Sequence, residues 1–82
     1  MSPVKTSLAA SSVRAEAVFV SGLQRGDRPS PGDVRQAVAE VIRELGEPGC
    51  AGRVAQEFGD HPETAATRMR WARTVASRAF TA

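Results

Sequence analysis

The sequence predicts an all-α fold, a compact four-helix domain with a C-terminal helix-turn-helix. Apolar residues recur at helical spacing, most clearly over residues 34–45. Serine, proline and glycine stand where helices are expected to begin and end. With three Phe, one Trp and no Tyr among 82 residues, the core of this single small domain must consist mostly of Val, Ala, Leu and Ile.

Residues 1–10 are predicted to be a disordered tail, because they are rich in serine and small residues without a sustained apolar stripe. Residues 11–82 then form a single helical domain. The first helix is expected to begin near Ser11 or Ser12, with Ser12 as its cap, and to run to about Gln24. Its inner face holds Ala15, Val18, Phe19 and Leu23. A loop follows at residues 25–29.

The second helix has the clearest start and stop signals. Ser30 is its expected cap, Pro31 fills the first helical position, Asp33 lies three residues after the cap, and Gly46 stops the helix. One face carries an apolar stripe of Val34, Ala37, Val38, Val41, Ile42 and Leu45. We expect this stripe to face the core. Its alternative use is as a dimer seam, although the run is too short for a sustained coiled coil.

A short third helix is expected after a turn at residues 47–49, from about Cys50 to Phe58. Val54, Ala55 and Phe58 should face inward, and the small Ala55 would allow the next helix to approach closely. Gly59 can adopt the left-handed conformation that ends this helix. Together with the following helix, it forms the predicted helix-turn-helix at about residues 50–79.

The fourth helix is expected from Pro62 to about Ala79, with Asp60 or His61 as its cap. Its inner sector contains Ala65, Met69, Ala72, Ala76 and Ala79, and its opposite side contains Glu63, Thr67, Arg70 and Thr74. The small inner residues predict close packing. The outer side offers hydroxyl and guanidinium groups of the kinds that contact phosphates and base edges.

The order of small, aliphatic and basic residues over about 50–75 follows a known pattern. The matching positions are Val54-Ala55 and Gly59, then Thr64, Thr67-Arg68, Met69 and Ala72-Arg73. This pattern resembles the second half of the sigma-factor region 4 domain, a bacterial module that reads the upstream promoter element. Gly52, Ala66 and Trp71 depart from it. The chain has no room for a promoter-melting region, so the resemblance implies a stand-alone regulator of transcription or an accessory module.

The distribution of charge also favours DNA binding. Residues 61–82 contain four arginines and one glutamate, whereas residues 31–60 contain three arginines and six acidic residues. A basic helix in the major groove is therefore the leading hypothesis. The expected DNA-binding residues are Thr64, Thr67, Arg68, Arg70 and Arg73. The alternative is that the acidic second helix partly neutralises the basic one. For Arg68, a phosphate contact and an intramolecular pair with an acidic residue are both open.

The alternative function is a protein-interaction module that binds RNA polymerase, a sigma factor or another regulator without direct DNA contact. Trp71 and Arg78, on one flank of the fourth helix, are the expected partner-binding residues, because exposed Trp is enriched in interface hot spots. Trp71 has a second option, which is to cover the first helix or the end of the second. A homodimer is also an open alternative.

We expect no enzyme activity, no cofactor and no metal site. His61 is the only histidine and has no second ligand at metal-binding spacing, so its expected role is in the turn before Pro62. Cys50 is the only cysteine; it has no base motif and cannot form an internal disulfide, which fits a reducing cytoplasm. The apolar run at residues 17–20 is too short to span a bilayer. We therefore expect a cytoplasmic protein that does not contact membranes.

Overall fold

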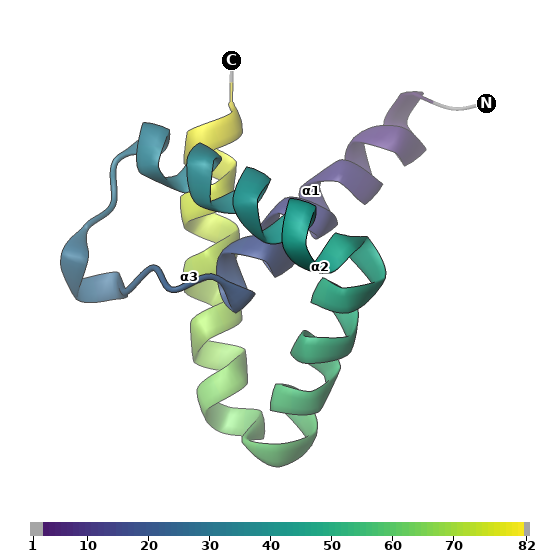
Figure 1. Cartoon of the computed structure of the whole chain (residues 1–82), viewed down its shortest axis with the longest axis vertical. Coiled ribbons are helices and arrows are strands. Elements are labelled where there is room, and N and C mark those ends of the chain that lie inside the picture. The colour runs from purple at the N-terminus through teal and green to yellow at the C-terminus, as the bar shows by residue number, and fades with distance from the viewer. Residues whose placement is uncertain (1–2, 82) are drawn as a thin grey trace.

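The computed structural model describes the backbone of residues 3–81 and the side chains of residues 10–81. Over this range the fold is all-α, as predicted (Figure 1). Helix α1 spans Pro3–Val20, a 3-10 turn η1 spans Arg25–Asp27, α2 spans Pro31–Asp60 and α3 spans Pro62–Phe80. Each α-helix packs against the other two. No helix in the described range has an apolar stretch long enough to cross a lipid bilayer.

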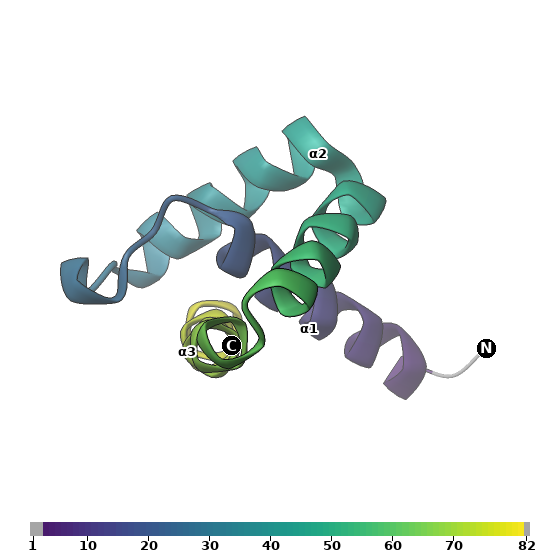
Figure 2. The ribbon, with the colours of Figure 1, turned by 90° about the horizontal axis from the view of Figure 1, so that it is seen from below.

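Helix α2 is bent at Gly46 into two arms, residues 31–45 and residues 47–60. Figure 2, in which α3 is seen end-on, shows the two arms meeting at a sharp angle. Gly46 has φ 69° and ψ 171°, a backbone conformation that essentially only glycine adopts. The predicted turn at residues 47–49 is wrong, because Pro48 is tolerated in the first turn of a new helical arm. The described chain therefore has three α-helices, one of them bent, where the sequence predicts four.

The start of α2 is formed as predicted. The Ser30 hydroxyl accepts a hydrogen bond from the Asp33 backbone N–H at 3.1 Å. The Ser30 backbone N–H donates in return to a carboxylate oxygen of Asp33 at 3.2 Å. This reciprocal capping box satisfies two backbone donors that have no partner inside the helix.

Helix α1 differs from its prediction at both ends. It begins at Pro3, so the expected tail over residues 1–10 is helical from residue 3, and residues 1–2 lie outside the described range. Proline suits the first turn of a helix, and Leu and Ala nearby are good helix formers. Ser12 consequently lies inside the helix and does not cap it. The helix ends at Val20, before the predicted Gln24, and the Ser21 hydroxyl donates to the Val18 carbonyl at 2.6 Å.

Helices α2 and α3 meet at one residue, His61, which holds the cap position of both. Its backbone N–H donates to the Glu57 carbonyl at 2.7 Å, and its carbonyl accepts from the Ala65 N–H at 2.9 Å. The predicted left-handed conformation of Gly59 is wrong: Gly59 lies within α2, and Gly46 is the glycine with positive φ in the described chain. The joint thus lacks the separate three- or four-residue turn that is typical of a helix-turn-helix.

The inner face of α3 forms the centre of the core, as predicted. Its buried residues are Ala65, Met69, Ala72, Ala76 and Ala79. They belong to one cluster with Ala15, Ala17, Val18 and Phe19 of α1 and with Val34, Val38, Cys50 and Val54 of α2. The rest of the α2 stripe, from Ala37 to Leu45, is half-buried. Its core orientation is thereby confirmed only in part.

Two inward-facing predictions for the second arm of α2 are wrong. Val54 is buried, but Ala55 is exposed and Phe58 is 37% exposed. Cys50 and Val54, four residues apart, define the inner side of this arm, and Ala55 points about 100° away from Val54 around the helix axis. Phe58 reaches only the edge of the core, where its ring stacks on Phe19 with 6.0 Å between centroids.

Candidate functional site

The five predicted DNA-binding residues of α3 lie on three different parts of the surface. Thr64 and Arg68 line a groove with the end of α1 and the second arm of α2. Thr67 and Arg70 line a hollow with Arg25 of η1. Arg73 lines another groove, between α3 and α1. The predicted set therefore divides into two pairs, Thr64 with Arg68 and Thr67 with Arg70, and Arg73 lies apart from both.

Arg68 is engaged inside the protein. Its guanidinium donates hydrogen bonds to the carbonyl oxygens of Phe19 at 2.7 Å, Ser21 at 2.9 Å, Leu23 at 3.0 Å and Val18 at 3.4 Å. Carbonyls at a helix C-terminus lack partners within the helix and favour a nearby positive charge. Arg68 therefore caps the end of α1. Of the two options for this residue, the contact is intramolecular, but its partners are backbone carbonyls and not an acidic side chain.

The burial of Arg68 is reflected in its pKa and in its aromatic neighbours. Burial lowers the pKa of Arg68 from its ordinary value, although a guanidinium remains charged in proteins. Its central carbon lies 5.3 Å from the Trp71 ring centroid and 5.9 Å from that of Phe19. Trp71 is half-buried and packs against the core cluster. A DNA phosphate would have to displace these contacts in order to reach Arg68.

Two further arginines connect helices through contacts that were not predicted from the sequence. Arg35 of α2 donates from Nη1 to the Ala79 carbonyl at 2.9 Å, near the end of α3. Arg14 of α1 places its guanidinium 4.4 Å from the centroid of the Phe80 ring. The only hint for Arg35 is its place beside the buried Val34, and this hint does not reveal which carbonyl lies within reach.

The hollow at η1, which we call the basic hollow, is lined by Arg25, Thr67, Arg70, Trp71 and Thr74 and has a volume of ≈ 440 Å³. Both arginines and both threonines are exposed. Arg70 donates to the Thr67 hydroxyl at 3.3 Å, and that hydroxyl donates to the Glu63 carbonyl at 3.2 Å. The Thr74 hydroxyl donates to the Arg70 carbonyl at 3.1 Å. Two guanidiniums and two hydroxyls thus surround a half-buried indole.

Arg70, Arg73 and Arg78 of α3 are all exposed. Partial neutralisation of α3 by the acidic α2, the alternative considered from the sequence, stays a prediction.

Cys50 does not have the surroundings of a nucleophile. Its side chain is buried in the core. Burial is the main cause that raises the pKa of the Cys50 thiol, and the negative charge of Glu16 adds to it; Arg53 opposes this rise, and Glu47 adds a smaller one. The reactive thiolate form is therefore disfavoured.

The chain has no match among protein-family models, curated proteins or solved structures. The resemblance of residues 50–75 to sigma-factor region 4 accordingly stays a prediction. The roles of Trp71 and Arg78 as partner contacts also stay predictions.

Proposed function

We propose that the protein is a small DNA-binding regulator of transcription, or an accessory module, that contacts duplex DNA through the outer face of α3 and η1. The observation that carries this proposal is the basic hollow, where Arg25 and Arg70 converge with the hydroxyls of Thr67 and Thr74. Arginine and threonine are typical phosphate ligands, and arginine can also bind a base edge through two hydrogen bonds. Among the described side chains, no carboxylate lines the hollow.

The shape of α3 supports the same use. Its buried residues occupy one narrow sector, so its opposite side is free to approach a major groove about 12 Å wide. Glu63, the one acidic residue of α3, lies in the first turn, where it stabilises the positive end of the helix. It precedes Arg70 by about two turns, roughly 10 Å along the axis. DNA can therefore lie over the middle of α3 without covering Glu63.

Replacing Arg25 or Arg70 with glutamine is expected to weaken binding to duplex DNA and to reduce its salt dependence. Each lost phosphate contact should lower the magnitude of the log K against log salt slope by about 0.9. The measurement is fluorescence anisotropy of a labelled mixed-sequence duplex of about two helical turns, titrated at several NaCl concentrations.

The matched control is Arg43→Gln, which removes an exposed arginine on the side of α2 opposite its buried stripe. It should keep the wild-type slope. A wild-type protein that does not bind the duplex at low salt, or Arg25→Gln and Arg70→Gln variants with the wild-type slope, would contradict the proposed function.

The second candidate is the protein-interaction module, which binds RNA polymerase, a sigma factor or another regulator. It is favoured by the Phe58 ring, which is 37% exposed and stacked on Phe19 with 18° between the ring planes. Phe19 also lines the groove of ≈ 620 Å³ that holds Thr64 and Arg68. An exposed aromatic ring beside a groove is a typical anchor for a protein partner.

If this surface binds RNA polymerase, Phe58→Ala should weaken that binding by roughly 30-fold or more, the effect of an anchor worth about 2 kcal/mol. Phe58→Leu, which keeps an apolar side chain, should lose less. Biolayer interferometry with purified bacterial core and holoenzyme measures both variants. Equal binding by wild type and Phe58→Ala, or no binding by wild type, would exclude this use of the groove.

A further inference from the structure

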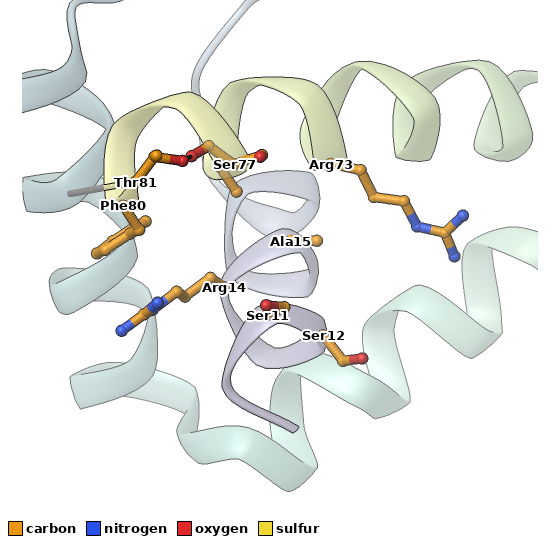
Figure 3. A pocket seen from close by; sticks show the side chains of 9 residues that line it. Ser11, Ser12, Arg14, Ala15, Arg73, Ser77, Phe80 and Thr81 are labelled. Atoms are coloured by element: carbon orange, nitrogen blue, oxygen red, sulfur yellow. Dashed lines mark hydrogen bonds between the residues drawn. The ribbon is translucent and has the colours of Figure 1, made fainter. Parts of the chain in front are cut away.

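A second basic surface lies where the middle of α1 crosses the last turns of α3 (Figure 3). We call it the α1–α3 groove. It has a volume of ≈ 300 Å³, and its polar lining consists of Arg14, Arg73, Ser11, Ser12, Ser77 and Thr81. Within residues 10–81, no acidic side chain lines it. The groove therefore combines positive charge with hydroxyl donors, which is the chemistry that recognises phosphate oxygens.

The two arginines of this groove lie apart. Arg14 is held over the Phe80 ring by a cation–π contact, with 4.4 Å between its central carbon and the ring centroid. Arg73 is exposed on the other side of α1, and Figure 3 shows the two guanidiniums pointing in different directions. One small anion cannot bridge them. A chain of phosphates that passes over Ser11 and Ser12 can meet both.

The basic hollow lies on the outer face of α3, opposite its buried stripe, and the α1–α3 groove lies on one flank of that face. The α3 residues of the hollow are Thr67, Arg70, Trp71 and Thr74, and those of the groove include Arg73, Ala76, Ser77 and Phe80. At about 100° per residue, the two sets point roughly 120° apart around the helix axis. A helix that lies in the major groove has one phosphate strand along each side. Two basic surfaces that point roughly 120° apart around α3 can each meet one of these strands.

We infer that duplex DNA straddles α3, with one phosphate strand at the basic hollow and the other over the α1–α3 groove. This inference rests on the proposed function and extends it. Arg73 contacts DNA here together with α1 and not together with Arg70. Helix α1, through Arg14 and its serines, becomes part of the DNA-binding surface. The charge complementarity of the groove and its position relative to the hollow carry the assignment.

The test compares variants of the basic hollow with variants of the α1–α3 groove in the salt titration of the mixed-sequence duplex. Arg14→Gln with Arg73→Gln should lower the magnitude of the salt slope by about two, as should Arg25→Gln with Arg70→Gln. Arg14→Lys with Arg73→Lys should keep most of the slope, because phosphate contacts require the charge. Arg43→Gln is again the matched control.

Each outcome bears on the inference. The hollow pair is Arg25→Gln with Arg70→Gln, and the groove pair is Arg14→Gln with Arg73→Gln. If the hollow pair lowers the slope and the groove pair does not, DNA binds at the basic hollow only, so the inference is wrong while the proposed function stands. If wild type does not bind the duplex, both are wrong. Thermal melts identify any variant that unfolds. If the groove pair unfolds, Arg73→Gln alone decides, because Arg73 is exposed: a slope lower by about one supports the inference, and an unchanged slope overturns it.

Discussion

Arg68→Ala is expected to lower the free energy of unfolding by about 2–4 kcal/mol. The substitution removes hydrogen bonds to four carbonyls, those of Val18, Phe19, Ser21 and Leu23. It also removes the cation–π contacts of the guanidinium with the Phe19 and Trp71 rings. Water can hydrate some of the freed carbonyls, so the expected loss is smaller than the sum of four charged hydrogen bonds. Urea unfolding followed by circular dichroism measures the change.

Two further variants test whether the loss of stability arises because Arg68 no longer caps the end of α1. Arg68→Lys keeps the charge but cannot spread donors over several carbonyls as a planar guanidinium does, so it should lie between wild type and alanine. Arg70→Ala removes an exposed arginine from the same helix and should change stability by no more than about 0.5 kcal/mol. If Arg68→Ala and Arg70→Ala have equal effects on unfolding, the capping role of Arg68 is wrong.

The parts of the fold that could be predicted depend on local rules. The capping box of Ser30 and Asp33 follows from residues three apart, and the buried stripe of α3 follows from helical spacing. The bend in α2 was harder to predict, because Gly46 and Gly59 both precede a proline by two or three residues. Pro48 permitted an immediate new helical arm after Gly46, whereas Gly59 had no need of positive φ, because His61 alone makes the second corner.

The candidate site was less predictable because it depends on how distant segments meet. Arg68 reaches a carbonyl 49 residues away in sequence, at Phe19, and Arg35 reaches one 44 residues away, at Ala79. A helical wheel places Arg68 at the margin of the inner face but cannot supply its partner. It likewise cannot show that Arg25 and Arg70 line the same hollow, or that Arg73 lines a groove together with α1. Residue type therefore identified the basic helix, and tertiary packing decides which arginines remain free to bind a ligand.

Gly46→Ala is expected to destabilise the domain by about 1–3 kcal/mol, whereas Gly59→Ala should stabilise it by up to about 1 kcal/mol. The first variant forces a side chain onto a backbone with φ 69° and ψ 171°. Its new Cβ would lie 3.7 Å from the Pro48 Cδ, an ordinary contact, so the cost arises from the backbone conformation. At Gly59 the new Cβ would meet no atom within 4 Å beyond the neighbouring backbone of its own helix, and alanine is the better helix former.

Thermal and urea unfolding of both glycine variants decide where the chain turns. Opposite signs support the bend at Gly46 and the helical state of Gly59. The reverse pattern, a destabilised Gly59→Ala beside an unaffected Gly46→Ala, would place a left-handed residue at Gly59. That result would restore the turn expected of a helix-turn-helix and would contradict the one-residue joint at His61. The pair therefore tests the feature in which this fold departs from the predicted helix-turn-helix.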